Sequence, residues 1–281
     1  MSQIKKDEIR SLRLKAEQIR KRTIQIIFKA RTGHTGGSLS SVDLLTTLYF
    51  KVLNFRPSEP NWSDRDRFIM SKGHSVEGLY CVLSKAGFFS DEILDTYGDF
   101  KTILAGHPTR RVPGVEVNSG ALGHGLPVGV GVSIAAKMDG KSLRTFVMMG
   151  DGEQGEGSIY EAAMAAGHYG LDNLIAIIDR NGLQISGRTE DVMGLEPMRE
   201  RWESFGWEVS EVDGNDIEAL VELFEGMKPN GKPHLIISHT TKGKGVSYME
   251  NVAKWHHGVP TAEQFDLAMS EFDARIEFLK D

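Results

Sequence analysis

The sequence predicts a single domain of the α/β class, a mostly parallel sheet with helices on both faces, and three observations support this. Short apolar runs alternate with helical patterns along the chain, an order typical of βαβ units. The run Leu174–Ile178 is apolar at every position, as expected for a central strand buried on both faces. No repeat or linker divides the 281 residues. We therefore expect one domain, 1–281, with an extended tail from about residue 242.

The expected helices follow from apolar residues spaced three and four positions apart. The first covers Asp7–Ala30 and ends at Gly33, since glycine is favoured after a helix C-terminus. Residues Gly33–Gly37 are expected to form a loop that leads into a second helix, from Ser40 through Leu48. Further helices are expected at Ser158–His168 and Gln264–Leu279.

The expected strands are short runs of apolar and β-branched residues. They are Arg67–Ser71, Leu143–Met149, Leu174–Asp179, Trp207–Val209 and Leu235–His239. Between Gly98 and Pro127 the regular pattern gives way to a segment rich in glycine and proline. We expect a long irregular loop there, and loops of that length in compact domains are usually functional.

Composition excludes several classes of protein. Hydrophobic residues make up 40% of the chain and charged residues 26%, which excludes disordered, collagen-like and disulfide-stapled chains. The net charge of −6 argues against a nucleic-acid or membrane-surface partner. The apolar stretch Leu126–Ala136 is too short and too rich in glycine to span a bilayer. A single cysteine, Cys81, suits a core position and a reducing compartment, so we expect a cytoplasmic protein.

Two polar residues follow neighbouring predicted strands. Asp151 lies between two glycines directly after one strand, and Asn181 follows the next strand, thirty residues later. Open α/β sheets bind ligands at the carboxyl ends of their strands, so we expect both side chains at one edge. Hard oxygen ligands of this kind suit Mg²⁺ shared with substrate phosphates. A backbone carbonyl after Asn181 could add another oxygen.

This spacing resembles the thiamin-diphosphate motif, Gly-Asp-Gly followed about thirty residues later by Asn. The rest of the chain is similar to the N-terminal, diphosphate-binding domain of transketolase. The matching segments occur in the family's order: Gly33–Ser38, Ser71–His74, Gly106–Pro108, Gly120–Gly125, Gly150–Gly157 and His257–Gly258.

The resemblance implies a role for each matching position. Asp151, Asn181 and the carbonyl of Leu183 would hold Mg²⁺. The positions that would contact thiamin diphosphate are His74, Gly120, Leu122, Gly152, Asn181 and His257. The positions that would act in catalysis are His34, His107, His257 and Glu156. The three histidines would face the reacting carbons and sugar hydroxyls, and Glu156 would join a carboxylate network at a subunit interface that links two cofactors.

Elementary chemistry agrees with these roles. A diphosphate is multiply anionic and needs a metal and hydrogen-bond donors. Histidine suits proton transfer because its ordinary pKa of about 6.5 lies near working pH. The remaining histidines, His168, His234, His239 and His256, are expected to be structural or exposed, and His124 is assigned no role. Lys242 and Lys244 remain open between a phosphate contact and a solvated loop. Glu161 remains open between the network and the helix dipole.

Transketolase-like enzymes normally continue into a pyrimidine-binding domain and a C-terminal domain. The first of these carries the glutamate that protonates the cofactor's aminopyrimidine ring. The sequence stops at Asp281, so we expect a split enzyme whose cofactor lies between this chain and a C-terminal subunit. A dimer of this subunit capped by two partner chains, a heterotetramer, is the expected assembly.

The resemblance implies a transketolase of the pentose phosphate type, which moves a two-carbon ketol unit from a ketose to an aldose. A split enzyme of the same chemistry that acts on a sulfonated or branched sugar, or on a 2-keto acid, is a close alternative. A non-catalytic subunit that binds thiamin diphosphate is a third. The histidine set favours a sugar, because a keto-acid decarboxylase has no need to address several hydroxyls.

Overall fold

The computed structural model describes residues 3–280. At its centre is a five-stranded sheet of order β1-β2-β3-β7-β6, in which every neighbouring pair is parallel. The strands are β1 (Arg67–Met70), β2 (Thr145–Gly150), β3 (Leu174–Arg180), β6 (Glu208–Asp213) and β7 (His234–His239). All five lie where the sequence predicts them, with ends shifted by up to a few residues. A separate antiparallel pair, β4 (Leu183–Gln184) and β5 (Gly187–Arg188), follows β3.

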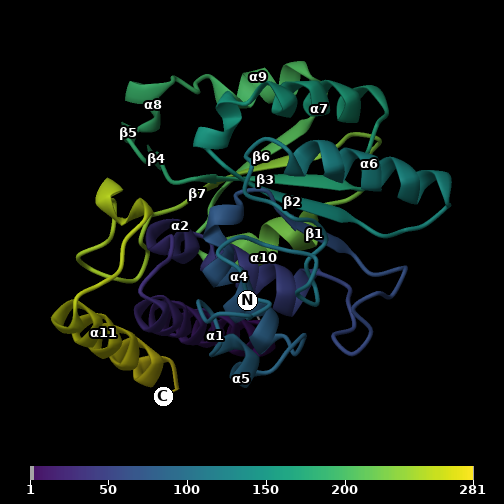
Figure 1. Cartoon of the computed structure of the whole chain (residues 1–281). Coiled ribbons are helices and arrows are strands. Elements are labelled where there is room, and N and C mark those ends of the chain that lie inside the picture. Colours follow the sequence, from purple (N-terminus) through teal and green to yellow (C-terminus); the bar gives the residue numbers. More distant parts are fainter. Residues whose placement is uncertain (1–2, 281) are drawn as a thin grey trace.

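Helices cover both faces of the sheet (Figure 1). One face carries α1 (Gln3–Ala30), α3 (Val42–Thr47), α4 (Val76–Lys85) and α10 (Ile217–Gly226). The other carries α6 (Gly125–Met138), α7 (Gly157–His168) and α9 (Met198–Ser204). Along β3, Ile175 and Ile177 pack toward the first set, whereas Ala176 and Ile178 pack toward the second. Burial on both sides explains the uninterrupted apolar run and confirms the predicted fold class.

The remaining elements are shorter or peripheral. They are α2 (Thr35–Ser40), a π-helical turn η1 (Leu48–Val52), α5 (Asp91–Leu94), α8 (Thr189–Val192), the 3₁₀ turns η2 (Gly73–Ser75), η3 (Gly152–Gly155) and η4 (Ala253–His256), and α11 (Ala262–Lys280). The last helix lies beside α1 (Figure 1) and closes a third apolar cluster that includes Ile24 and Phe272.

The expected loop at Gly33–Gly37 is wrong in part, because α2 already begins at Thr35. The two glycines inside this helix serve close packing instead. A Cβ on Gly36 would lie 2.8 Å from the Trp255 carbonyl oxygen, and one on Gly37 would lie 2.8 Å from Ser75 Oγ. Glycine here permits an approach that any side chain would block, so its presence does not mark a loop.

The segment predicted as irregular, Gly98–Pro127, is free of helix and strand through His124. Its last residues differ from the prediction, since α6 starts at Gly125 and includes Pro127. Proline is tolerated there because the first turn of a helix has no internal partner for its N–H group. Within residues 3–280 no helix is both long and apolar enough to cross a membrane, and Cys81 is buried as a free thiol.

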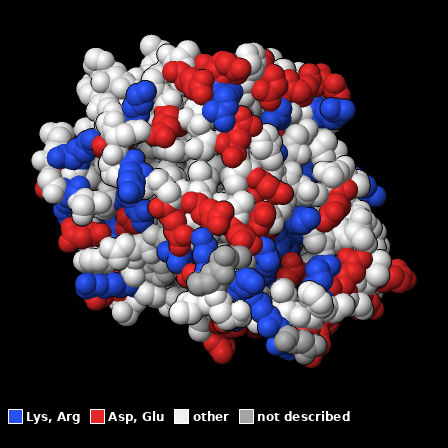
Figure 2. Space-filling view, turned by 180° about the vertical axis from the view of Figure 1, so that it is seen from behind, with Lys and Arg blue, Asp and Glu red and all other residues white. Residues whose placement is uncertain are grey.

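Acidic and basic side chains are interspersed over the face seen in Figure 2. Some of them join elements, as where Lys51, in η1, pairs with Glu8 of α1 at 2.8 Å and with Glu225 of α10 at 3.2 Å. Exposed pairs of this kind contribute little to stability.

Candidate active site

The carboxyl ends of β1, β2, β3 and β7 meet at one edge of the sheet, and a cavity of about 460 Å³ opens there. Three loops that the sequence singles out enter it, with His74 after β1, Asp151 after β2 and Asn181 after β3. Lys242 and His256 reach it from the chain after β7. Most of the predicted site residues therefore line a single cavity, whereas His107, His257 and Glu156 lie outside its lining.

The three expected metal ligands lie in the lining of this cavity. Asp151 Oδ1 accepts the Gly152 N–H at 2.8 Å and Oδ2 accepts the Gly182 N–H at 2.6 Å, which fixes the carboxylate against both loops. Burial raises the pKa of Asp151, and the nearby Asp179 carboxylate adds to the rise. A cation at this carboxylate would therefore relieve an unfavourable charge.

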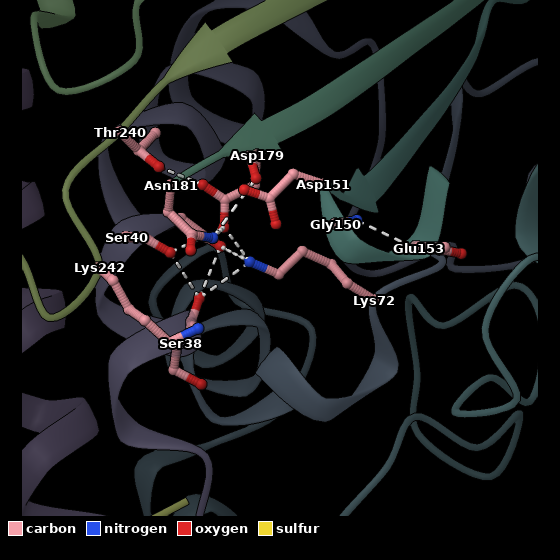
Figure 3. A network of polar contacts seen from close by, with 12 residues as sticks. Ser38, Ser40, Lys72, Gly150, Asp151, Glu153, Asp179, Asn181, Thr240 and Lys242 are labelled. Atoms are coloured by element: carbon pink, nitrogen blue, oxygen red, sulfur yellow. Dashed lines mark hydrogen bonds and ion pairs between the residues drawn. The ribbon is translucent and has the colours of Figure 1, made fainter. Parts of the chain in front are cut away.

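Asn181 is oriented by Asp179, two residues earlier at the end of β3. Its Nδ2 donates to Asp179 Oδ2 at 3.2 Å, and its Oδ1 accepts the Leu183 N–H at 3.2 Å. Figure 3 shows Asp151, Asp179 and Asn181 together at this edge. The amide is thus held from both ends, and Oδ1 keeps a second lone pair for a further partner.

Beneath the cavity, Lys72 and Asp179 form an ion pair in which both side chains are almost fully buried. The Lys72 ammonium also donates to the Gly37 carbonyl at 3.1 Å and to Ser41 Oγ at 3.0 Å. Asp179 also accepts from Ser40 Oγ at 2.8 Å and from Thr240. Burial opposes ionisation of Asp179, but the Lys72 ammonium outweighs it and holds the pKa of the carboxyl below its usual value.

A second ammonium group, that of Lys242, lies in the cavity wall and is 2% exposed. Its Nζ donates to the Leu183 carbonyl at 3.2 Å and lies 3.3 Å from His256 Nδ1. Burial, reinforced by repulsion from Lys72, lowers the pKa of Lys242 to about 8. The solvated-loop alternative for Lys242 is therefore wrong. Lys244 is partly exposed, lies outside the cavity lining and pairs with Glu250 at 3.7 Å.

The predicted histidines gather around His34. Ring centroids lie 5.6 Å away for His74, 5.7 Å for His107 and 4.8 Å for His257. Burial lowers the pKa of His34 to about 4, and His257 and His107 add to the shift. The His34 imidazole is therefore neutral at pH 7.

His256, which the sequence assigns no functional role, lies in the same cluster. Its ring stacks on His74 with centroids 5.1 Å apart. Burial, followed by the charge of Lys242, lowers the pKa of His256 to about 3. The other histidines without a predicted role lie outside the lining of this cavity; among them His239 is exposed and meets Glu211 at 2.8 Å.

Glycines make room within the cavity wall. A Cβ on Gly120, whose φ is +133°, would lie 2.6 Å from His107 Cδ2, and a Cβ on Gly152 would lie 2.6 Å from Gln184 Oε1. Leu122 adds a half-buried apolar side chain to the lining. Gly120 and Gly152, which are expected to contact the cofactor through main-chain groups, are thus positions where a side chain would collide with a neighbouring residue.

Glu156 lies outside the cavity lining, exposed at the start of α7. Besides Asp151, the lining includes a second acidic residue, Glu153, to which the sequence assigns no role. It accepts from Ser71 Oγ and from the N–H groups of Gly123 at 2.8 Å and Gly150 at 2.9 Å. Glu153 therefore ties together three loops that form the wall.

The donor set fits a metal-bound diphosphate. The Lys242 ammonium and the imidazoles of His34, His74 and His256 line the cavity and suit an anion. Asp151, Asn181 and a carbonyl oxygen offer hard ligands to a cation. Across residues 3–280 no three His, Cys, Asp or Glu side chains form a metal cluster. The expected Mg²⁺ site needs no such cluster, because its expected ligands are one carboxylate, one amide and one carbonyl oxygen.

Comparison with known proteins agrees with this geometry. Residues 11–272 match the family model of the transketolase thiamine diphosphate binding domain. The chain is 59% identical over 274 residues to one subunit of the apulose-4-phosphate transketolase of Phocaeicola vulgatus, a match that covers 97% of this chain and 98% of that protein. It is 40% identical over 264 residues to a 6-deoxy-6-sulfo-D-fructose transketolase subunit of a Clostridium species, covering 93% of this chain and 96% of that protein.

Solved structures give the same result. The transketolase of Campylobacter jejuni superposes with a TM-score of 0.84 at 30% identity, covering 96% of this chain and 48% of that one. For the transketolase of Leishmania mexicana the TM-score is 0.84 at 29% identity, with 96% and 45% covered. The chain thus spans just under half the length of these solved enzymes. It belongs to the transketolase family of transferases and matches proteins named as transketolase subunits along nearly their whole length.

Proposed function

We propose that this chain is the N-terminal subunit of a two-chain, thiamin-diphosphate- and Mg²⁺-dependent transketolase that transfers a two-carbon ketol unit from a ketose to an aldose. The observation that carries the proposal is the cavity at the carboxyl edge of the sheet. It joins the Asp151 carboxylate to the Lys242 ammonium and to a cluster of imidazoles around His34.

Each side of the cavity would hold a different part of the cofactor. Asp151, Asn181 and the Leu183 carbonyl would hold Mg²⁺, and a carbonyl oxygen has lone pairs enough for both the ion and Lys242. Lys242, His74 and the backbone of Gly152 would lie beside the diphosphate, with Lys72 adding positive charge from below. Gly120 and Leu122 would line the thiamin. When bound, the cofactor supplies the electron sink for carbon–carbon bond cleavage.

The histidines suit substrate positioning and proton movement. Because the His34 imidazole is neutral at pH 7, a ring nitrogen can accept a proton from a sugar hydroxyl. His107 and His257 are exposed beside it and would address further hydroxyls. This arrangement favours a sugar over a 2-keto acid, and three clustered imidazoles would have no evident use in a non-catalytic protein.

The names of the relatives narrow the range of candidate donor sugars. We propose a phosphorylated branched ketose of the apulose-4-phosphate kind, because the relative named for that substrate is 59% identical over almost the whole chain. A sulfonated ketose is the second candidate, since a relative named for 6-deoxy-6-sulfo-D-fructose is 40% identical. Both are modified sugars, and neither belongs to the pentose phosphate set that the resemblance first suggests.

The proposal includes a partner. We propose that residues 1–281 form one diphosphate-binding domain that dimerises and binds two C-terminal subunits as a cytoplasmic heterotetramer. Glu156, exposed at the start of α7, would join its carboxylate network only in that assembly. The buried free thiol of Cys81, whose pKa burial raises to about 12, is compatible with a reducing compartment.

A donor screen tests the function. The chain is co-purified with a subunit that carries the pyrimidine-binding and C-terminal domains, loaded with thiamin diphosphate and Mg²⁺, and offered each ketose with an aldose acceptor. Ketol transfer from a branched ketose phosphate, at a higher kcat/KM than from the sulfonated ketose or xylulose 5-phosphate, is the expected result. Turnover of 2-keto acids alone would contradict it.

A further inference from the structure

We propose that the chain carries a second small-molecule site, for an amphipathic organic anion, at the edge of the sheet opposite the cofactor cavity. A cavity of about 420 Å³ lies there, a volume in the range of ligand sites. Phe146, Ile175, Glu208 and His234 belong to the first two residues of β2, β3, β6 and β7 and line it. Because these strands are parallel, their first residues share the edge that faces away from Asp151.

The floor of this cavity is apolar. Phe146 and Ile175 belong to the core, and the half-buried Phe224 and Met227 complete the surface. The rings of Phe146 and Phe224 meet edge to face with centroids 6.3 Å apart. A ring or short hydrocarbon body would gain burial here against aromatic and aliphatic side chains.

The rim of the cavity is basic, although the protein as a whole carries a net charge of −6. Its lining has five basic side chains, Lys137, Lys141, Arg144, Lys228 and Lys232, and two acidic ones, Asp172 and Glu208. The acidic groups are already engaged. Asp172 pairs with Lys137 at 2.6 Å, and Glu208 accepts from Asn230.

Two of the five cations remain available for a ligand. Arg144 pairs with Asp66 at 2.6 Å and Lys141 with Asp64 at 3.0 Å. Lys228 and Lys232, in contrast, are exposed and form no ion pair within the part of the chain that the structure describes. They stand beside the apolar floor, so the cavity offers positive charge next to an apolar surface. A carboxylate, sulfonate or phosphate on an apolar body matches that combination.

The segment that carries both lysines is held in place. Asn230, between them, donates to Glu208 of β6 and accepts the Lys232 N–H at 3.1 Å. The Gly231 N–H donates to Asp172 Oδ2 at 3.2 Å, which ties the same segment to the turn before β3. A rim fixed to the sheet at two points loses little conformational entropy on binding. None of the lining residues also lines the cofactor cavity, so this proposal stands apart from the proposed function.

A pair of fluorescent probes of similar shape tests the site. The full chain is titrated with 8-anilinonaphthalene-1-sulfonate, an aromatic anion, and with N-phenyl-1-naphthylamine, which lacks the sulfonate. The double variant Lys228→Glu/Lys232→Glu should raise the Kd of the sulfonate about tenfold, since each exposed ionic contact contributes a few-fold. The Kd of the neutral probe should change less than twofold. Lys85→Glu, an exposed reversal outside this cavity, is the matched control and should change neither.

A second variant tests the floor. Phe224→Ala should weaken both probes, and thermal unfolding establishes that the variant is folded. An unchanged sulfonate Kd in the double variant would overturn the proposal. Equal losses of affinity for the two probes in the double variant would also overturn it, because the lysines would then not act through their charge. Retention of both affinities in folded Phe224→Ala would show that the probes bind elsewhere and would also overturn it.

Discussion

Lys72 and Asp179 form a buried ion pair at the point where β1 and β3 end, directly under the cavity that Asp151 lines. Through Asp179 the pair reaches Asn181, whose amide nitrogen donates to the same carboxylate at 3.2 Å. Figure 3 shows the Lys72 ammonium directed into this group of oxygens. The pair therefore supports the fold and orients an expected metal ligand.

Removing one member of this pair should destabilise the protein strongly. Lys72→Met leaves the Asp179 carboxylate buried without its cation, and we expect a loss of about 3–5 kcal/mol in the free energy of unfolding. Lys72→Met/Asp179→Leu should recover most of that loss because no uncompensated charge remains. Urea denaturation followed by circular dichroism measures both. Lys137→Met, which breaks the more exposed pair with Asp172, is the control and should cost less than about 1 kcal/mol. A similarly small loss for Lys72→Met would contradict this account.

The metal assignment predicts loss of cofactor binding. Asp151→Ala removes the only carboxylate among the three expected Mg²⁺ ligands, and Asn181→Ala removes the amide oxygen that Asp179 orients. In the complete complex each variant should abolish Mg²⁺-dependent binding of thiamin diphosphate, as measured by calorimetry. Asp139→Ala, exposed after α6, should bind normally. Unchanged affinity in the Asp151 variant would remove the metal site from the account.

Two histidines of the cluster should separate chemistry from binding. His107→Ala should lower kcat by about 10²–10⁴-fold if the imidazole transfers a proton, while cofactor affinity stays within a few-fold. His74→Ala should instead weaken cofactor binding, because His74 lines the cavity beside Lys242. Steady-state kinetics and calorimetry on the two-chain complex distinguish them, with the exposed His168→Ala as control. Full turnover in His107→Ala would exclude its catalytic role.

The lowered pKa of His34 predicts an acid dependence of stability. In the fold this pKa is about 4, and in the unfolded chain it returns to about 6.5. Between these values the unfolded chain binds more protons, so the free energy of unfolding falls as pH drops from 6.5 toward 4. His34→Asn should show a smaller drop over that window, and His168→Asn should follow the wild type. Parallel curves for the wild type and His34→Asn would contradict the assignment.

Much of this architecture follows from sequence patterns. The apolar run Leu174–Ile178 predicts a strand covered on both faces. The structure confirms this, because alternate residues of β3 pack against the helices on the two sides of the sheet. Asp151 and Asn181 could be placed at one edge because parallel neighbouring strands end together. Such local regularities depend on residues close in sequence, and they fix the strands and the loops that follow them.

One residue that sequence reasoning missed, His256, reaches the site through a tertiary contact. His34 and Gly258 form an isolated parallel bridge, and the Gly258 N–H donates to the Gly33 carbonyl at 3.3 Å. This contact brings His256, at the end of η4, to the His34 cluster together with His257. Neither the hydrophobic pattern nor the spacing of residues predicts that contact. The same holds for Lys72 and Asp179, which are 107 positions apart and meet only when β1 and β3 flank β2.

The central claim is that this cavity performs ketol transfer only in a two-chain enzyme. It is tested most directly by measuring transfer from a branched ketose phosphate to an aldose with thiamin diphosphate and Mg²⁺, in preparations free of host transketolase. Three preparations are compared: the chain by itself, its C-terminal partner by itself, and the reconstituted complex, with Asp151→Ala in the complex as control. We expect turnover in the wild-type complex alone. Substantial turnover by this chain without its partner, or by the Asp151→Ala complex, would contradict it.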